Sequence, residues 1–362
     1  MNNSVARTSR LFKLAIACSV LGSASWTAHA QTIINMTAVD GYPPKSLWIK
    51  EFIDFYIPEV DKRLAKNNQY KIRWNQAWGG QIVKPNGVLE GIQKGLGDIG
   101  IVTTAIYGNK MNVLAVAYAT PFVTNDPELV TKTIDEMAMK FPSIKKTFAS
   151  YNQVYLTNSV VLDTYQVFTK PAVKSLADMK GLKIAGAGFN LRYLAPIGAV
   201  GVSGPLTGYY NQTQTGVVDG SLLWPEAADT FKMAEVAPNM LKADIGSVNT
   251  KVLTVNADVW AKLPAEVKKV LQEVAIEYRD LLAKIAKNEG ASSINAYKKA
   301  GGTVYELSKS ERTQWANSLP NMAKEWAAGL DKEGMQGTEM LSYYMNAMRA
   351  AKQPIERQWD KQ

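Results

Sequence analysis

Cysteine and histidine are almost absent from this sequence of 362 residues. The single cysteine is Cys18 and the single histidine is His29, so both lie within residues 1–30. Without those residues the chain has no thiol and no imidazole. This excludes a disulfide, a Cys or His nucleophile pair and a zinc site built on Cys or His. It also excludes the side chain that most often acts as a general base near pH 7.

Acidic residues are missing from the start of the chain, where none precedes Asp40. Three basic residues lie within residues 7–13, an apolar stretch covers about residues 14–26, and Ala28-His29-Ala30 follows. This order is typical of a secretory signal peptide, so we expect cleavage after Ala30 and export to the periplasm. The alternatives are a membrane anchor, for which the apolar run is shorter than the ~20 residues required, and a lipid-modified Cys18.

A basic stripe interleaved with aromatic residues is also missing. The formal net charge is +9, and loss of the three basic residues of the leader lowers it to +6. The remaining lysines are scattered among Asp and Glu, as on solvated helix faces. Nucleic acid is therefore not expected as a partner, whereas a mildly positive surface suits anionic solutes.

Strand-like and helical patterns alternate along the chain and predict an α/β fold. We expect strands at 32–38, 70–75 and 98–102 with helices between them, in a parallel sheet. A second unit begins near Val154 with a long strand over 154–162, a strand at 181–185 and a helix from about Leu191. Residues 216–220 resemble residues 97–100, which indicates equivalent points in two similarly built lobes.

The last third of the sequence reads as helical. One apolar face continues from Pro264 to about Lys299, which predicts a helix long enough to cross two lobes. A coiled coil is the alternative, but sustained heptads are absent. Two more helices are expected after Ser310 and Thr338, and the polar end after Pro354 is expected to be loose.

Five segments in a fixed order carry a family resemblance: Leu89–Gly100, Thr120–Val123, Lys170–Ile184, Gln214–Gly220 and Val259–Pro264. Together they resemble the DctP-like substrate-binding proteins of TRAP (tripartite ATP-independent periplasmic) transporters. The resemblance covers about residues 32–345. It implies a Venus-flytrap fold with two lobes, which close on a ligand in the cleft between them, and a long helix that spans both lobes.

On this resemblance we expect four parts of the chain. Residues 1–30 form the signal peptide, and residues 346–362 form a C-terminal tail. Lobe I comprises residues 31–155 and about 246–287. Lobe II comprises residues 156–245 and about 288–345.

The sequence departs from the family where an arginine usually pairs with the ligand carboxylate. Ala185 occupies that position, and Asp163-Thr164-Tyr165 stands where a further arginine is often found. Arg192 is the replacement candidate, because it lies one turn into a predicted helix whose glycine-rich start can meet an anion. The alternative is that Arg192 is solvated or packs between the lobes. Asn190 is either a ligand contact or a helix cap.

Aromatic residues gather near predicted strand ends, where open α/β sheets bind ligands: Tyr42, Trp78, Tyr165, Phe189, Tyr209, Tyr210 and Trp224. Such walls favour an aromatic or apolar monocarboxylate over a dicarboxylate or a sugar acid. Thr103 and Thr104 end a strand and can donate hydrogen bonds, and Glu226 either accepts from a ligand hydroxyl or caps a helix. The predicted ligand-binding residues are Arg192, Trp224, Tyr42, Trp78, Thr104, Tyr165, Phe189, Asn190, Tyr210, Asn211 and Glu226.

The resemblance implies transport without chemistry on the ligand, with no cofactor or metal. Its partners would be a small organic acid and the large and small TRAP membrane subunits, and the chain would be a monomer. A solute-binding protein of another transporter class, or one for a dicarboxylate or sugar acid, remains the alternative. An exported hydrolase or lyase that uses carboxylates is a further alternative, although the lack of histidine excludes a Ser-His-Asp triad.

Overall fold

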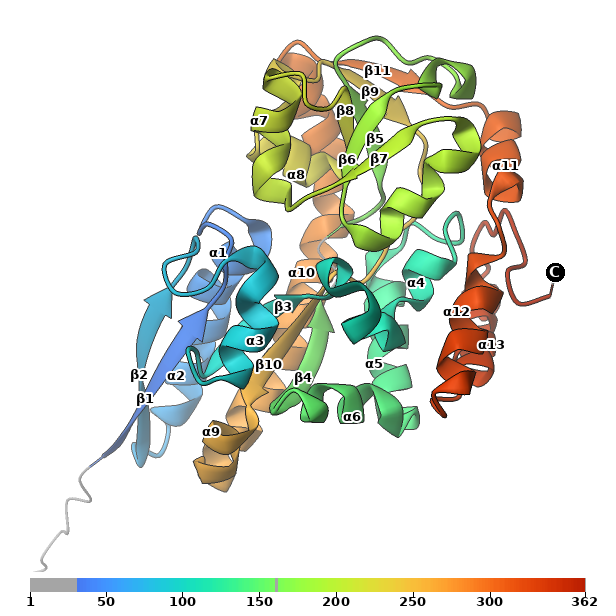
Figure 1. Ribbon diagram of the computed structural model, residues 1–362. Helices are drawn as coiled ribbons and strands as arrows, with labels where there is room; N and C mark the ends of the chain where they lie inside the picture. Colours follow the sequence, from blue (N-terminus) through green and yellow to red (C-terminus); the bar gives the residue numbers. More distant parts are fainter. Residues whose placement is uncertain (1–30, 160–161, 362) are drawn as a thin grey trace, which may run out of the picture.

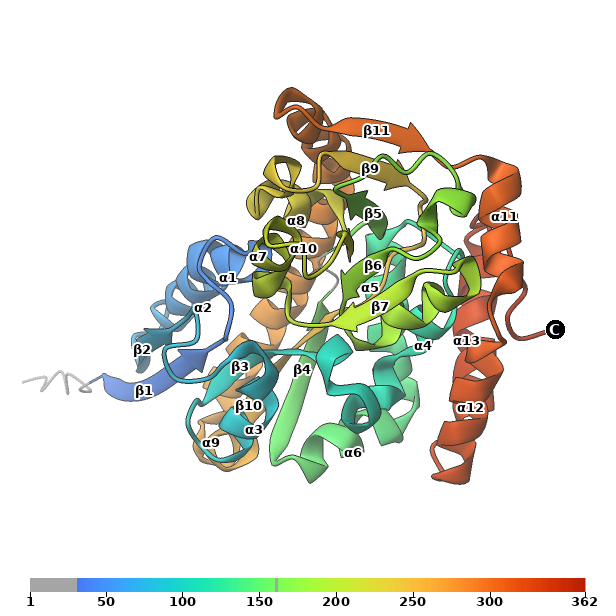
Figure 2. The ribbon, with the colours of Figure 1, turned by 45° about the horizontal axis from the view of Figure 1, so that its top comes forward.

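Strands and helices alternate from Thr32 onward, and the strands form two separate sheets (Figures 1 and 2). The computed structural model describes residues 31–159 and 162–361. The predicted signal peptide lies outside these residues. Each sheet is covered by helices, which gives two lobes, one above the other in Figure 1.

The sheet of lobe I has the strand order β2-β1-β3-β10-β4. Its strands are β1 (Thr32–Val39), β2 (Tyr70–Ala77), β3 (Ile99–Thr103), β4 (Gln153–Ser159) and β10 (Lys251–Asn256). All residues of β3 and β10 are buried, because both strands lie inside the sheet and are covered on both faces.

The sheet of lobe II has the order β11-β9-β5-β8-β6-β7. Its strands are β5 (Gln166–Thr169), β6 (Lys183–Gly186), β7 (Val200–Ser203), β8 (Gly220–Leu223), β9 (Asn239–Lys242) and β11 (Thr303–Glu306). β8 lies inside this sheet, as β3 does in the other, and each follows a helix and a Gly/Asp turn.

Both sheets are mixed, which differs from the predicted parallel sheet. β1 is parallel to β2 and β3, but β10 is antiparallel to β3 and β4, and β5 is antiparallel to β8 and β9. The prediction of a parallel sheet was based on the alternation of strands and helices. β5 and β10 do not follow this alternation, because each is the first strand after the chain has crossed from the other lobe.

The helices lie around the two sheets. In lobe I they are α1 (Leu47–Glu51), α2 (Ile57–Leu64), α3 (Val88–Gln93), α4 (Val116–Ala119), α5 (Pro127–Lys140), α6 (Pro142–Ser150) and α9 (Ala257–Lys262). A π-helical turn, η1 (Phe52–Tyr56), joins α1 to α2. In lobe II they are α7 (Tyr209–Gln214), α8 (Pro225–Thr230) and α11 (Lys309–Ser318). Short 3-10 segments are η2 (Pro85–Gly87), η3 (Thr104–Leu114), η4 (Leu176–Met179), η5 (Gly188–Tyr193), η6 (Ala195–Ile197), η7 (Leu206–Gly208) and η8 (Met233–Glu235).

Two local predictions differ from the structure near β6. The helix expected from about Leu191 is replaced by η5 and η6, and β7 was not predicted at all. The long strand expected over 154–162 ends as β4 at Ser159, and its continuation through 160–161 lies outside the described residues.

Two neighbouring segments carry the chain between the lobes, one between β4 and β5 and the other between β9 and β10. The amide of Tyr165 donates to the Gly246 carbonyl at 3.3 Å, and the Ile245 amide donates to the Tyr165 carbonyl at 3.1 Å. The two segments are thus paired by hydrogen bonds where they pass the cleft.

The long helix α10 (Ala265–Lys299) is the third connection and has the predicted bounds. Its 35 residues span about 52 Å at 1.5 Å per residue. It packs on α2, α5 and β4 of lobe I and on α8 of lobe II, so it runs behind both lobes in Figure 1. No helix of residues 31–159 and 162–361 has the length and apolarity needed to cross a membrane.

The C-terminal helices return to lobe I. α12 (Met322–Lys332) and α13 (Gly337–Ala350) pack on α4 and α5, although residues up to 345 were predicted to belong to lobe II. A helix corresponding to α12 was not predicted.

The expectation of a loose end after Pro354 is wrong. Trp359 is fully buried and its indole donates to the Pro121 carbonyl at 2.9 Å. The Glu356 carboxylate accepts from Arg312 at 2.9 Å and from Thr313 at 2.8 Å, both on α11. The tail therefore connects α11 of lobe II with the segment that follows α4 in lobe I.

Candidate functional site

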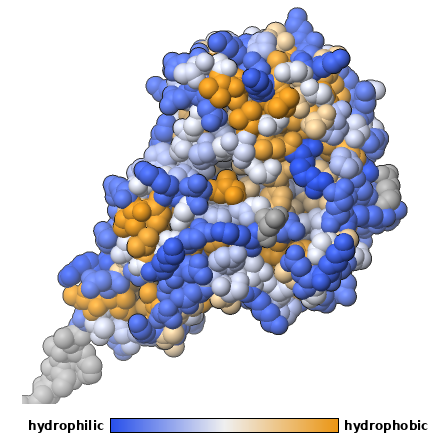
Figure 3. Space-filling model, viewed as in Figure 1, coloured by the Kyte–Doolittle hydropathy of each residue, from blue (hydrophilic) through white to orange (hydrophobic). Residues whose placement is uncertain are grey.

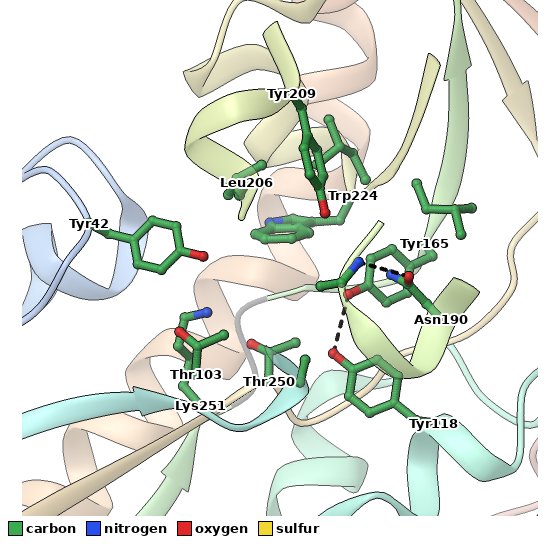
Figure 4. A pocket seen from close by; sticks show the side chains of 14 residues that line it. Tyr42, Thr103, Tyr118, Tyr165, Asn190, Leu206, Tyr209, Trp224, Thr250 and Lys251 are labelled. Atoms are coloured by element: carbon green, nitrogen blue, oxygen red, sulfur yellow. Dashed lines mark hydrogen bonds between the residues drawn. The ribbon is translucent and has the colours of Figure 1, made fainter. Parts of the chain in front are cut away.

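A cavity lies between the two lobes, beside the paired crossing segments (Figure 4). On the face drawn in Figure 3, apolar residues are also visible at the waist between the lobes. In this closed arrangement the cavity has a volume of about 30 Å³. The cavity is lined by Tyr42, Thr103, Ala105, Tyr118, Tyr165, Ala187, Asn190, Leu206, Tyr209, Leu222, Leu223, Trp224, Thr250 and Lys251.

Lys251, the first residue of β10, brings the only charged side chain to this lining. The residue is 2 % exposed. Its ammonium lies 4.1 Å from the centroid of the Trp48 ring and 5.2 Å from that of Tyr42. Within residues 31–159 and 162–361 this nitrogen forms no hydrogen bond or ion pair, so it can bind a ligand anion directly.

Asp40 lies behind Lys251, at the end of β1, and is fully buried. Its carboxylate accepts from the Tyr42 amide at 2.9 Å and from the Trp48 indole at 3.0 Å. Burial raises the pKa of Asp40 to about 7 and lowers the pKa of Lys251 to about 7, and the attraction between the two opposes both shifts.

Three hydroxyl groups surround the ammonium on the lobe I side of the cavity (Figure 4). They belong to Tyr42, Thr103 and Thr250. The hydroxyls of both threonines are buried without a hydrogen-bonding partner among the described residues. Burial raises the pKa of Tyr42 far above its usual range, so its hydroxyl is a neutral donor. A cation and several free donors can together bind an anionic group such as a carboxylate.

The opposite walls of the cavity are aromatic and aliphatic. The ring of Trp224 meets that of Tyr165 edge-on, with centroids 6.3 Å apart. Leu206, Leu222 and Leu223 complete these walls. The Tyr118 and Tyr165 hydroxyls lie 3.3 Å apart at the far side from Lys251 (Figure 4).

Four predicted site residues line this cavity, namely Tyr42, Tyr165, Asn190 and Trp224. Each lies in the loop that follows a strand or in a segment that crosses the cleft, which is the reasoning that selected them. Asn190 caps η5, because its Oδ1 accepts from the Ala187 amide at 3.0 Å, and its Nδ2 is buried without a partner among the described residues.

Arg192 and Phe189 lie elsewhere, in a neighbouring surface groove between η5 and α12. The Arg192 side chain is 46 % exposed and is paired with Glu325. The segment that carries it is a short 3-10 turn, and Arg192 is not among the residues that line the cavity. The structure therefore does not bring Arg192 to the place where a ligand carboxylate would lie.

The remaining predicted residues support the site or lie outside it. Glu226 accepts from the Trp224 indole at 2.9 Å and from Thr230 at 2.7 Å, so it fixes the Trp224 ring. Thr104 donates to the Thr250 carbonyl at 3.3 Å, and Trp78 packs on Phe52 at 5.6 Å. The Tyr210 hydroxyl donates to Glu235 on the surface, and Asn211 is exposed.

Lys251 is the residue that sequence reasoning missed. The available signal was a lysine at the start of the apolar run Val252–Val255, since a charge within a buried strand requires a partner or a function. Asp40 gives the same kind of signal, as the first acidic residue after the apolar β1. Tyr118, Thr250 and the leucines could not be assigned from sequence, because their place depends on how the lobes meet.

The lobes touch around the cavity. Lys45, in the loop before α1, donates to the Thr230 carbonyl of α8 at 3.1 Å. The Tyr193 hydroxyl of η5 donates to the Tyr118 carbonyl at 2.7 Å. Gly188 approaches Ala105 so closely that an added Cβ would lie 2.2 Å from the Ala105 carbonyl oxygen. These contacts hold the lobes closed around the space beside Lys251.

Among the described residues, no group of three or more His, Cys, Asp or Glu side chains could hold a metal ion. The lining of the cavity includes no carboxylate. The arrangement can bind and enclose an anion.

Known proteins share this architecture. Residues 60–329 match the model of the bacterial extracellular solute-binding proteins, family 7, also called DctP. A C4-dicarboxylate-binding periplasmic protein DctP of Rhodobacter capsulatus is 35 % identical over 125 residues, which are 34 % of this chain and 37 % of that protein. The matched stretch thus spans little more than a third of the length of that relative.

Two solved structures show the same fold at low sequence identity. A TRAP solute-binding protein of Rhodoferax ferrireducens, in complex with copurified benzoate, has a TM-score of 0.79 and 18 % identity, over 88 % of this chain and 98 % of that one. DctP7 of Bordetella pertussis, an extracytoplasmic solute receptor binding pyroglutamic acid, has a TM-score of 0.72 and 19 % identity, over 86 % and 99 %. With the family model matching most of its length, this chain belongs to the bacterial extracellular solute-binding proteins of family 7.

Proposed function

We propose that this protein is the periplasmic solute-binding component of a TRAP transporter and that it binds a small monocarboxylate with an aromatic or apolar body. The ligand carboxylate pairs with Lys251. The observation that carries the proposal is a buried ammonium, free of any ion pair, in a cavity whose other walls are mainly aromatic and aliphatic.

The number of charges favours a monocarboxylate. Lys251 is the only cation in the lining, and the next candidate, Arg192, is paired with Glu325 in another groove. A second carboxylate would lose its hydration without gaining a cation, which costs several kcal/mol. The similar structures have been solved with benzoate and with pyroglutamic acid, so the fold alone does not select the ligand. Selection comes from the residues of this cavity.

Transport requires only capture and release. When the anion enters, it adds contacts to both lobes and thereby favours the closed arrangement. The closed protein then delivers its ligand, chemically unchanged, to the membrane subunits. The absence of histidine and cysteine after His29 agrees with this, because it removes the commonest catalytic side chains.

Calorimetric titration with benzoate and with short aliphatic acids tests the proposal. Lys251→Met keeps the length of the side chain but removes its charge, and Arg192→Gln removes the other candidate charge as a matched control. We expect Lys251→Met to weaken binding about thirtyfold or more, and Arg192→Gln to change it less than about threefold.

A second variant guards against a folding effect. In Lys251→Met, the buried Asp40 carboxylate loses its neighbouring cation. A double variant that combines Asp40→Asn with Lys251→Met removes both charges. This double variant should fold and still fail to bind the acid. Retained affinity in both variants, or loss of affinity in Arg192→Gln alone, would contradict the role of Lys251.

A further inference from the structure

The side of the cavity opposite Lys251 is polar but carries no charge (Figure 4). Three side chains from three parts of the chain meet there: Tyr118 from α4, Tyr165 from a crossing segment and Asn190 from η5. The hydroxyl oxygens of the two tyrosines are 3.3 Å apart, so one hydroxyl donates to the other. Figure 4 shows the two tyrosine hydroxyls directed toward one another and the Asn190 amide bonded to the backbone amide of Ala187.

Some donor hydrogens of these three groups have no acceptor among the described residues. The hydrogen bond between the tyrosines uses one of their two O–H groups, which leaves one free. The Asn190 Oδ1 accepts from the Ala187 amide, whereas the Asn190 Nδ2 is buried with no partner among the described residues. A buried donor without an acceptor is unfavourable. A ligand oxygen placed here would satisfy it.

Burial keeps the two tyrosine hydroxyls on this side of the cavity uncharged. Burial raises the pKa of Tyr165 to about 12 and holds the pKa of Tyr118 well above its usual range, so both hydroxyls are neutral at any physiological pH. Asn190 lies close enough to Tyr165 to offset part of its rise, although the two do not reach hydrogen-bond geometry. No cation lines this side, so a charged ligand group would be unpaired here.

We propose that Tyr118, Tyr165 and Asn190 form a second subsite, which binds a neutral hydroxyl or carbonyl oxygen of the ligand. The ligand is then a monocarboxylate with two ends: its carboxylate lies at Lys251, its apolar middle lies against Trp224 and Leu222, and an uncharged oxygen reaches the tyrosine pair. This inference rests on the proposed function and adds to it the residues that select among monocarboxylates.

The test compares acids that differ by one hydroxyl group. Benzoate, the three hydroxybenzoate isomers, phenylacetate and 3-hydroxyphenylacetate are titrated calorimetrically into the wild-type protein. At least one hydroxylated acid should bind about tenfold more tightly than its parent. Isophthalate, with a carboxylate in place of the hydroxyl, should bind more weakly than benzoate.

Substitutions then locate the selectivity. Tyr118→Phe and Tyr165→Phe should each remove most of the preference, so that the ratio of the affinities for the hydroxylated acid and its parent falls toward one. Tyr209→Phe is the matched control. It removes a hydroxyl that lines the same cavity but already donates to the Gly204 carbonyl at 3.2 Å, so the preference should persist.

The outcomes separate this inference from the proposed function. If the acids bind and depend on Lys251 but no hydroxylated acid is preferred, or the preference survives in both tyrosine variants, the second subsite is refuted and the carboxylate site stands. If the wild-type protein binds none of these acids, both proposals are refuted.

Discussion

At the scale of single residues, the charge on Lys251 is itself sensitive to its surroundings. Lys251 and Asp40 are both buried, and each has a pKa shifted to about 7. The aromatic residues around them, Tyr42, Tyr107 and Tyr278, have pKa values raised by burial and remain neutral. The affinity for an anion near Lys251 and Asp40 therefore depends on how many protons these two residues carry.

The affinity for a monocarboxylate should decrease as the pH rises through about 7. Above this pH Lys251 loses its proton and Asp40 loses its own, and both changes make the cavity less positive. A bound anion raises both pKa values, so binding takes up protons. Calorimetry between pH 6 and 9 should show a loss of up to about tenfold per pH unit.

The number of protons exchanged can be measured independently at pH 7, in buffers of different ionisation enthalpy. The uptake should be smaller in Asp40→Asn, which keeps the Lys251 ammonium but removes one of the two titrating groups. An affinity that is constant from pH 6 to pH 9 would show that the pair does not titrate in the free protein.

Part of the site can be predicted from residues alone. Tyr42, Tyr165, Asn190 and Trp224 follow strands or cross the cleft, and the geometry of open α/β sheets places such residues at a ligand site. Lys251 could not be identified in this way, because its position depends on β10 pairing between β3 and β4, which lie far from it in sequence. Arg192 was predicted to bind the ligand because of its charge, which is evident from the sequence. The direction of its side chain is set by the turn η5.

At the scale of secondary-structure elements, the approach of η5 to η3 determines how far the lobes close. Gly188 begins η5 with a φ of +51°, and an added Cβ would lie 2.2 Å from the Ala105 carbonyl oxygen of η3. Glycine is thus required here both for its backbone angle and for the missing side chain.

Gly188→Ala should therefore hinder closure. We expect the affinity for the ligand to fall about tenfold or more, since a methyl group must displace backbone atoms of the other lobe. Gly216→Ala is the matched control, because Gly216 also has a positive φ, of +76°, but nothing lies within 4 Å of an added Cβ.

Small-angle scattering complements the affinity measurement. With ligand added, Gly188→Ala should keep a larger radius of gyration than the wild-type protein, whereas Gly216→Ala should contract normally. Equal affinity and equal contraction in the two variants would show that η3 and η5 do not limit closure.

Elements with strong local patterns were predictable. β1, β2, β3 and α10 have the expected positions, because alternation or a continuous apolar face defines each of them. β7, with four residues, and the short turns η5 and η6 carry no such pattern. The end of the chain is ordered by Trp359 and Glu356, whose partners at Pro121, Arg312 and Thr313 are long-range contacts that composition does not reveal.

At the scale of the whole molecule, two lobes are joined by two hydrogen-bonded crossing segments, the helix α10 and the C-terminal tail (Figure 2). The ligand site lies next to the crossing segments, which supply Tyr165 and Thr250. A ligand at this place contacts both lobes at once, since Lys251 belongs to lobe I and Trp224 to lobe II. Small changes in the site can thus be converted into movement of the lobes.

The most direct test is a crystal structure of the protein soaked with 3-bromobenzoate, whose bromine can be located by anomalous scattering. The account predicts the ligand between the lobes, with its carboxylate at hydrogen-bonding distance from the Lys251 ammonium and its ring against Trp224. A bromine peak in the groove beside Arg192 and Glu325, with the cavity at Lys251 unfilled, would contradict it.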